Sequence, residues 1–261
     1  METAVPTPIQ PLIDAYLHAL KPLRTHLYGI YIYGSIALGA FEEQESDIDI
    51  VALTQGEWAA PELIQLENIH TRLIQQNSFG DRLAPLYVPF SDIGKNNAEI
   101  APYPYAADGT FHVAGYFDLN AVTWWMLKNY GIRLLGPESS VLPIEIEWKE
   151  VLKAMHYNLH TYWASKAATP DLFLSDYWVT FSVTTLCRIL TAIEEGKIIA
   201  KSPALTYWRD RLPINFRLLI DEAWRIRHDP HLPSLFHSST ERMSETLAFI
   251  QYGRERGSKK G

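Results

Sequence analysis

Two carboxylates stand two positions apart in the segment Ser46-Asp47-Ile48-Asp49-Ile50. The β-branched residues around them predict a strand, in which residues i and i+2 point to the same face. Asp47 and Asp49 would therefore lie side by side, where their charges repel each other unless a cation lies between them. Divalent cations that prefer oxygen ligands meet this requirement. The segment thus predicts a metal site, with Ile48 and Ile50 packed into the core on the other face.

A glycine and a serine directly follow the preceding apolar segment, YGIYIY at 28–33. Its β-branched and aromatic residues predict a buried strand that ends at Gly34. Glycine allows a sharp turn and a close approach of backbone N–H groups to a ligand. Ser35 adds a hydroxyl where a helix could begin, and the first N–H groups of a helix attract phosphate. Phosphate at this turn and metal on the next strand together suit transfer from a nucleoside triphosphate.

The N-terminal half of the chain supplies the elements that would position these residues. Apolar spacing predicts helices and strands here, the helices at 10–26 and 61–75 and the strands at 28–33, 46–53 and 83–89. Pro85 favours an edge or irregular position for the last of these strands. Residues 91–115 mix glycine, proline and asparagine and predict a long loop.

Helical patterns dominate from residue 118 onward. Six helices are predicted, over 119–130, 144–165, 177–195, 203–211, 215–227 and 241–254. We therefore expect an α+β protein, in which an α/β domain with a small mixed sheet precedes an α-helical bundle. The expected divisions are the first domain at 1–118, a connecting region at 119–143, the helical domain at 144–254 and a flexible tail at 255–261.

The composition of the 261 residues, with 47% hydrophobic and 20% charged, is typical of a soluble globular protein. The 30 acidic and 23 basic side chains give a formal net charge of −7, which disfavours a nucleic-acid partner and suits a small cationic ligand. No apolar run reaches the roughly 20 residues that span a membrane, and no secretory signal is found. Because Cys187 is the single cysteine, we expect a cytoplasmic protein without disulfides.

The motif residues resemble a known family. The segment YGSIALGAFEEQESDIDIVAL, at 33–53, resembles the signature of the DNA-polymerase-beta-like nucleotidyltransferase superfamily. Within that superfamily, the chain resembles the streptomycin/spectinomycin adenylyltransferases, which modify aminoglycosides. The resemblance continues through 124–137 and through 184–208 of the helical domain. The net charge and the lack of a basic stripe disfavour the superfamily's polymerases and tRNA nucleotidyltransferases.

The resemblance implies a nucleotidyltransferase that moves AMP from ATP to a hydroxyl of a small, cationic acceptor, such as an aminoglycoside or aminocyclitol. Asp47 and Asp49 would be catalytic and hold Mg²⁺, while Gly34 and Ser35 would bind the triphosphate. We expect a monomer whose partner is this small molecule, with no membrane or nucleic-acid partner. Antibiotic resistance is the biological role that the resemblance suggests.

Two cations of the helical domain, Arg188 and Lys201, match the nucleotide-binding residues of the family. A guanidinium and an ammonium both suit a triphosphate, and the resemblance implies a site between the two domains. The alternative is that both are ordinary surface cations, with Lys201 in a loop after the Arg188 helix.

The chain departs from the family pattern at the expected general base. In the family, an acid on the third strand takes the proton of the acceptor hydroxyl, and the matching residue here is Ala84. Asp81 is the nearest substitute and would need a bulge at Pro85 or another register, whereas Glu99 and Asp108 are more distant candidates. Since a general base supplies roughly 10²–10⁴-fold in rate, the alternative is a nucleotide-binding protein with weak or lost transfer.

The expected acceptor-binding segment departs as well. It reads Asp171-Leu-Phe-Leu-Ser-Asp176-Tyr-Trp178, with an aromatic residue where the family has an acid. Asp176 and Trp178 are the candidate substrate-binding residues, because a carboxylate or an aromatic face can hold an amine. The alternative role of Asp176 is the N-cap of the helix that follows.

Overall fold

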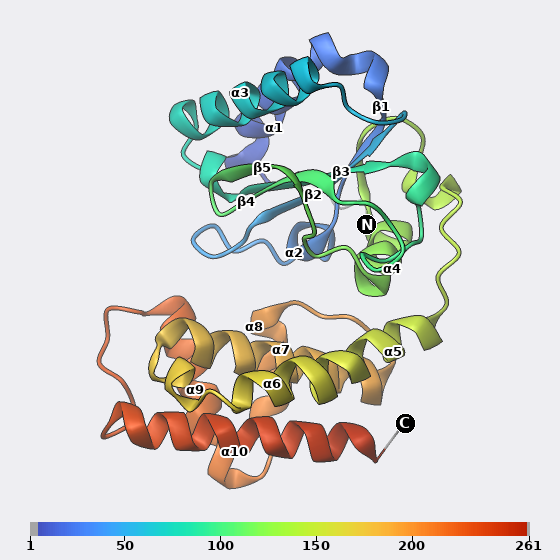
Figure 1. Cartoon of the computed structure of the whole chain (residues 1–261). Coiled ribbons are helices and arrows are strands. Elements are labelled where there is room, and N and C mark those ends of the chain that lie inside the picture. The colour runs from blue at the N-terminus through green and yellow to red at the C-terminus, as the bar shows by residue number, and fades with distance from the viewer. Residues whose placement is uncertain (1–4, 260–261) are drawn as a thin grey trace. The chain divides into compact units, whose positions relative to one another are not determined.

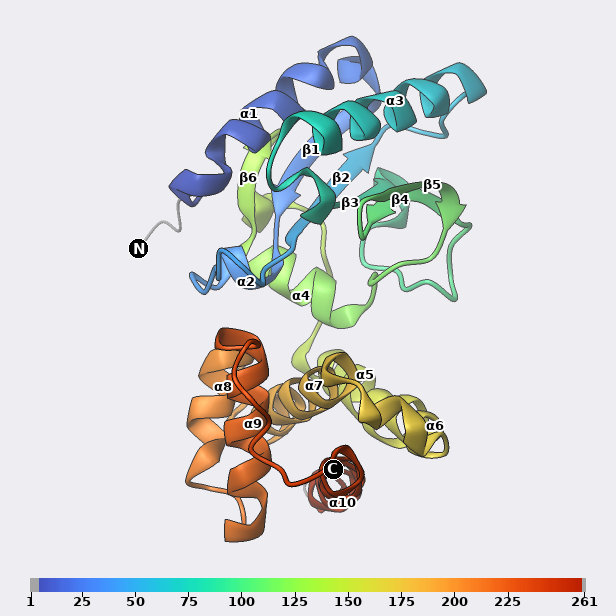
Figure 2. The same ribbon diagram turned by 90° about the vertical axis from the view of Figure 1, so that its left-hand side faces the viewer.

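The structure, a computed structural model, describes residues 5–259 and divides into two compact units, Met1–Glu147 and Trp148–Gly261. Each unit has its own elements, shown in Figures 1 and 2. The first unit contains a mixed sheet, and the described part of the second is helical. The predicted α+β class is therefore confirmed.

A six-stranded sheet forms the centre of the first unit, in the order β5-β4-β3-β2-β1-β6. The strands are β1 Leu27–Ile32, β2 Ile48–Thr54, β3 Leu83–Pro89, β4 Tyr103–Ala107, β5 Thr110–Gly115 and β6 Ile132–Leu135. Strands β2 and β3 are parallel, whereas the other neighbours are antiparallel. The parallel pair requires a crossover, which contains helix α3 (Ala60–Gln76).

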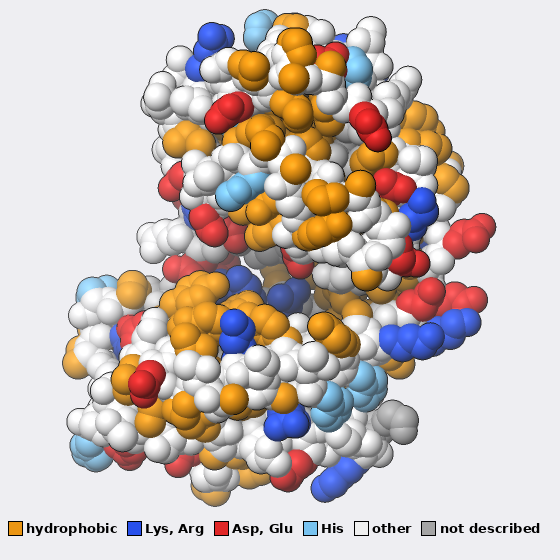
Figure 3. Space-filling view, viewed as in Figure 1, with side chains coloured by type: hydrophobic (Ala, Val, Ile, Leu, Met, Phe, Trp, Pro, Cys, Tyr) orange, Lys and Arg blue, Asp and Glu red, His pale blue; other side chains and the backbone are white. Residues whose placement is uncertain are grey.

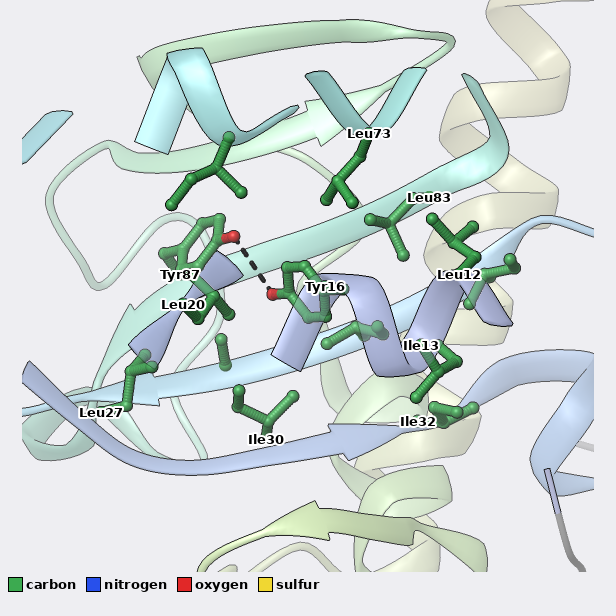
Figure 4. Packing of buried hydrophobic residues seen from close by; sticks show 14 of the residues in the cluster. Leu12, Ile13, Tyr16, Leu20, Leu27, Ile30, Ile32, Leu73, Leu83 and Tyr87 are labelled. Atoms are coloured by element: carbon green, nitrogen blue, oxygen red, sulfur yellow. Dashed lines mark hydrogen bonds between the residues drawn. The ribbon is translucent and has the colours of Figure 1, made fainter. Parts of the chain in front are cut away.

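Side chains alternate between the two faces of this sheet. Ile48, Ile50 and Ala52 of β2 belong to a hydrophobic cluster with buried residues of α1 (Gln10–Ala19) and α3. Figure 4 shows part of this cluster, including the hydrogen bond from Tyr16 to Tyr87. Because the side chains of a strand alternate, Asp49 points to the opposite face. The helices α2 (Gly34–Ala37) and α4 (Ala121–Tyr130) contact each other beside the sheet.

Three expectations for the first unit were wrong. Residues 91–115 are not one long loop, because they contain β4 and β5, joined at Asp108-Gly109. An Asp-Gly pair between extended segments is a hairpin signal, and both residues have positive φ, 48° and 68°. Pro85 lies in an interior strand, paired between β2 and β4. The expected connecting region 119–143 supplies α4 and the edge strand β6 to the first unit.

The second unit packs several helices around buried apolar residues such as Trp163, Leu186 and Phe249. The helices are α5 Trp148–Tyr157, α6 Trp163–Ala167, α7 Asp176–Glu195, α8 Lys201–Arg209, α9 Arg217–His228 and α10 Ser239–Ser258. The predicted helix 144–165 is interrupted by a π-helical segment, Asn158–Tyr162. Figure 3 shows hydrophobic side chains gathered on part of the visible surface of this unit.

Helix α10 continues to Ser258, into the segment expected to be a flexible tail. Residues 260 and 261 of that expected tail lie outside the described residues. Among the described residues, none of the helices combines the length and the apolar character needed to cross a bilayer.

Candidate active site

The glycine turn and the carboxylate strand are in direct contact. Gly34 has a φ of 70°, which favours glycine. A Cβ at this position would overlap with the carboxylate oxygen Oδ2 of Asp49. The backbone N–H of Tyr33 also donates to the carbonyl of Asp49, at 3.0 Å. The absence of a side chain at Gly34 therefore allows the Asp49 carboxylate to lie against the turn.

Ser35, next to Gly34, connects the turn to the loop that precedes β2. Its hydroxyl donates to Oγ of Ser46 at 3.1 Å, and Ser46 Oγ accepts the backbone N–H of Glu42 at 2.9 Å. Ser46 is buried, whereas the neighbouring Asp47 is exposed and Asp49 is half-buried. These bonds tie the loop before β2 to the turn after β1. Ser35 and Ser46 are eleven positions apart in sequence, and their hydrogen bond brings the turn and the carboxylate strand together.

The donor set of this group suits a hard divalent cation. Carboxylate oxygens are the ligands that Mg²⁺ prefers, and Mg²⁺ sites commonly use one or two carboxylates with water and substrate phosphates. Asp47 and Asp49 supply such a pair. Within residues 5–259, no three or more His, Cys, Asp or Glu side chains are grouped to form a metal site. The protein side of a metal site here would consist of the two aspartates, which fits a metal shared with a phosphate ligand.

No acid lies beside Asp49 on strand β3. The parallel register pairs Asp49 with Ala84, and it runs from Ile48–Leu83 to Thr54–Pro89 without a shift. A bulge at Pro85 is therefore absent from the described strand pair. Asp81 lies on the 3-10 turn Gly80–Arg82 before β3, next to Gly109 of the β4–β5 turn. The structure thus places Asp81 outside the strand position beside Asp49.

Two further residues near the carboxylates were missed by the sequence reasoning. Tyr33 is 3% exposed, and its hydroxyl has no hydrogen-bond partner among the described residues. Burial raises the pKa of Tyr33 well above its ordinary value, and the nearby charges of Asp118, Asp49 and Asp47 raise it further. Tyr33 therefore remains a neutral hydroxyl within the field of three carboxylates.

The second missed residue is Asp118, two positions before Asn120, the N-cap of α4. The available sequence signal was a polar pair in front of a helix, which is equally typical of capping residues. The Asn120 side chain accepts the N–H groups of Val122 and Thr123, at 2.8 and 3.4 Å. Because Asn120 performs the capping, Asp118 is not the N-cap of α4.

In the second unit, Arg188 lies on α7 and Lys201 is the first residue of α8. The expectation that Lys201 lies in a loop was wrong, because α8 begins two positions before the expected start at 203. Nε of Arg188 donates to the carbonyl of Ile199 at 3.0 Å, which fixes the chain just before Lys201. Both cations are half-buried. Their contact with a nucleotide remains an expectation from the resemblance.

Asp176 and Trp178 lie in the first turn of α7, and each already has an internal partner. Ser175 is the N-cap, so Asp176 is the first helical residue and not the cap. Its carboxylate forms an ion pair with Arg242 at 2.6 Å. Nζ of Lys166 lies 5.0 Å from the centre of the Trp178 ring, which shows that this aromatic face holds a cation.

The Asp176 ion pair belongs to a larger buried network around Glu222, whose side chain is fully buried. Arg242 and Arg225 both bind Glu222, and Ser234 and the Leu235 N–H donate to it. Burial alone would raise the pKa of Glu222, but these hydrogen bonds outweigh it and lower the pKa to about 2. Asp176 is itself exposed, so its carboxylate pairs with this buried network from the surface of the helical unit.

Comparisons with known proteins agree with this description. Residues 145–249 match the family of the aminoglycoside adenylyltransferase C-terminal domain. The fold is similar to the crystal structure of spectinomycin adenyltransferase from Enterococcus faecialis with ATP and spectinomycin, with a TM-score of 0.67 and 17% identity. The match covers 92% of this chain and 98% of that chain. No curated protein sequence matches the chain.

Proposed function

We propose that this aminoglycoside adenylyltransferase-like protein transfers AMP from ATP to a hydroxyl of a small molecule, with pyrophosphate as the leaving group. The observation that carries the proposal is the contact between Gly34 and Asp49. It joins a turn suited to phosphates with a strand suited to a metal ion. The match of 145–249 and the similarity to a structure solved with ATP and spectinomycin support the same reaction.

The residues of the first unit would act on the triphosphate end of the nucleotide. The turn at Gly34 would present backbone N–H groups to phosphate oxygens, and Ser35 would add its hydroxyl. Asp47 and Asp49 would hold Mg²⁺, which when bound neutralises the charge of the phosphate oxygens. The resemblance assigns Arg188 and Lys201 to nucleotide binding, for which a guanidinium and an ammonium supply the positive charge. Each of these residues supports nucleotide binding without forming a covalent bond.

For the acceptor, we propose a small cationic molecule such as an aminocyclitol or aminoglycoside. The net charge of −7 favours a cationic ligand. Trp178 is the proposed contact, because its ring already lies against the ammonium of Lys166. Asp176 is a weaker choice, since its carboxylate is engaged by Arg242. If an ammonium of the acceptor replaced that of Lys166 on the Trp178 ring, the cation–aromatic contact would be conserved.

The test is a transfer assay with purified protein, ATP and Mg²⁺ against a panel that contains spectinomycin, streptomycin and other aminoglycosides. Pyrophosphate release and the mass of the adenylylated product are measured. We expect turnover with at least one cationic acceptor, and its loss in Asp49→Asn. Glu57→Gln, an exposed change outside the proposed site, is the matched control. Absence of product with every acceptor would refute the transferase proposal.

A second candidate function is nucleotide binding without efficient transfer. The observation in its favour is Ala84, a methyl group beside Asp49 where a carboxylate would be expected to act as base. Calorimetry separates the two functions. Tight ATP binding in Mg²⁺, together with no pyrophosphate release for any acceptor, would favour the binding protein.

A further inference from the structure

The face of the sheet that carries Asp49 and Ala84 is crossed by the segment between β5 and α4. Tyr105 is the register partner of Leu86, which lies two positions after Ala84 on β3. Paired residues on neighbouring strands share a face, so Tyr105 lies on the same face as Ala84. The ring of Phe117 stacks on Tyr105, with centroids 5.4 Å apart and an interplanar angle of 3°. Phe117 therefore packs over the face that contains the candidate site.

Backbone hydrogen bonds fix this segment in place. The Tyr103 hydroxyl donates to the carbonyl of Phe117 and accepts its N–H, the latter at 2.9 Å. Tyr103 is buried on β4, and its hydroxyl oxygen also lies 2.9 Å from Oδ1 of Asn97, an alternative acceptor for the same proton. The position of the next residue, Asp118, is thus set by a buried side chain of the sheet.

The backbone of Asp118 has a φ of 26°, in a region that side chains rarely adopt. Its carbonyl accepts a hydrogen bond from the hydroxyl of Thr123, and Asn120 Nδ2 lies 3.4 Å from its carboxylate oxygen Oδ1. Strain of this kind persists only where surrounding contacts impose it, and it gathers at functional sites. Asn would tolerate such a backbone as well as Asp, so the backbone alone does not select a carboxylate.

A second observation indicates a ligand next to these acids. The buried Tyr33 hydroxyl has no hydrogen-bond partner among the described residues, although buried polar groups are nearly always bonded. Tyr33 follows β1, and alternation from Ile32 in the α1–α3 cluster directs its side chain to the Asp49 face. The charges of Asp118, Asp49 and Asp47 all act on it. A bound molecule between these groups would give the hydroxyl its partner.

We propose that Asp118 is the third carboxylate of the active site and the catalytic residue that replaces the acid missing at Ala84. The inference rests on the proposed nucleotidyl transfer. As the acceptor oxygen forms its bond to the α-phosphorus, its proton passes to the Asp118 carboxylate. The bond from that phosphorus to the bridging oxygen breaks, and its electron pair leaves with pyrophosphate. Asp118 then releases the proton to water, so the enzyme returns to its starting state.

The test compares Asp118→Asn with Asp81→Asn, which removes the other acid near β3. ATP and Mg²⁺ are used with the acceptor that gives most product, and with water alone, where the product is AMP. We expect kcat of Asp118→Asn to fall by roughly 10²–10⁴-fold, the usual contribution of a general base. The ATP dissociation constant from calorimetry and the Tm should stay close to those of the wild type. Asp81→Asn should retain its turnover.

A further variant, Asp118→Gly, separates catalysis from folding. Glycine accepts the positive φ without strain, so this variant should fold, as its Tm will show, and still lose turnover. If Asp118→Asn and Asp118→Gly both keep kcat within about threefold, well below the contribution of a base, Asp118 is not the base. A loss of ATP binding in both variants would also overturn the assignment, because it indicates a positioning residue. A wild type that binds ATP but makes neither product nor AMP refutes the transferase function itself, and the assignment of Asp118 with it.

Discussion

Ala84 lies directly beside Asp49 in the parallel ladder of β2 and β3. The register is unbroken along both strands, so the methyl group of Ala84 lies next to Asp49, one of the two candidate metal ligands. Strand β3 therefore contributes its backbone to the site but no acid. On the same face, Tyr103 and Tyr105 of β4 hold Phe117, the residue directly before Asp118. The proposed base, Asp118, therefore lies on a different element from β3, the strand on which the resemblance led us to expect an acid.

This relationship predicts that a carboxylate at position 84 can replace the one at 118. In the Asp118→Asn background, Ala84→Glu should recover about tenfold or more in kcat, part of the roughly 10²–10⁴-fold that a base supplies. The measurement is pyrophosphate release at saturating ATP and acceptor. Ala84→Gln in the same background is the control, since it has the same size without the charge. Equal rates for Glu and Gln would show that position 84 cannot serve as the base.

The contact between Gly34 and Asp49 predicts a severe effect of Gly34→Ala. The new Cβ would overlap with the Asp49 carboxylate, and the φ of 70° would be strained. The backbone strain alone costs about 1–2 kcal/mol, and displacement of Asp49 should lower ATP affinity in Mg²⁺ by roughly tenfold or more, which is about 1.4 kcal/mol of binding free energy. Urea unfolding and calorimetry measure the two effects.

Gly56→Ala is the matched control for this change. Gly56 also has a positive φ, 91°, but its Cβ would meet no described atom within 4 Å. It should lose stability through strain, while its ATP affinity stays unchanged. Equal ATP binding by Gly34→Ala and Gly56→Ala would contradict the proposed role of the turn.

Removal of the Tyr33 hydroxyl should weaken ligand binding without lowering the free energy of unfolding. Because that group lacks a partner among residues 5–259, Tyr33→Phe should leave the free energy of unfolding unchanged or raise it. One lost hydrogen bond to a bound ligand is worth about 0.5–1.5 kcal/mol, so affinity for ATP or the acceptor should fall roughly two- to tenfold. Unfolding in urea and calorimetric titration test both parts.

Tyr103→Phe provides the contrast, since the Tyr103 hydroxyl bonds both Phe117 and Asn97. Its loss leaves a buried N–H without an acceptor and should cost about 1–3 kcal/mol of stability. If Tyr33→Phe destabilises the protein as much as Tyr103→Phe does, the Tyr33 hydroxyl forms a hydrogen bond within the protein and does not await a ligand.

Local patterns were sufficient to predict the motif that carries the proposed chemistry. The strand before Gly34 and the alternation through Asp47 and Asp49 depend on neighbouring residues only, and strand β3 was predicted with its observed bounds, Leu83–Pro89. Both the register of β3 and the contact of Gly34 with Asp49 required the folded chain.

Other features depend on contacts between distant segments. The short edge strand β6 gains its pairing from β1, about a hundred residues earlier, and its four residues carry little pattern of their own. From the sequence alone, Asp118 could be the N-cap of the following helix, whereas the structure shows that Asn120 is the N-cap. Tyr33 was assigned to the core, correctly, but its unpartnered hydroxyl is visible only once its surroundings are assembled.

The buried pair of His70 and Tyr87 predicts how stability depends on pH. His70 is 1% exposed, its Nε2 lies 2.8 Å from the Tyr87 hydroxyl, and burial lowers its pKa to about 4. An unfolded histidine has a pKa of about 6.5, so the unfolded chain binds the proton first as the pH falls. The stabilisation from neutral His70 is therefore complete above pH ~6.5 and is lost progressively down to pH ~4, by about 3 kcal/mol in total.

Urea unfolding at intervals between pH 7 and 4 measures this slope, and His70→Gln should flatten it because glutamine does not titrate. A change in the absolute stability of the variant does not affect the comparison. The slope of the free energy of unfolding against pH alone depends on the proton that His70 binds. The buried Glu222 does not interfere in most of this range. Its pKa of about 2 lies below the ordinary value of 4.5, so its contribution is lost only as the pH falls from about 4.5 toward 2. A slope that is the same in the wild type and in His70→Gln would assign the pH dependence to other groups.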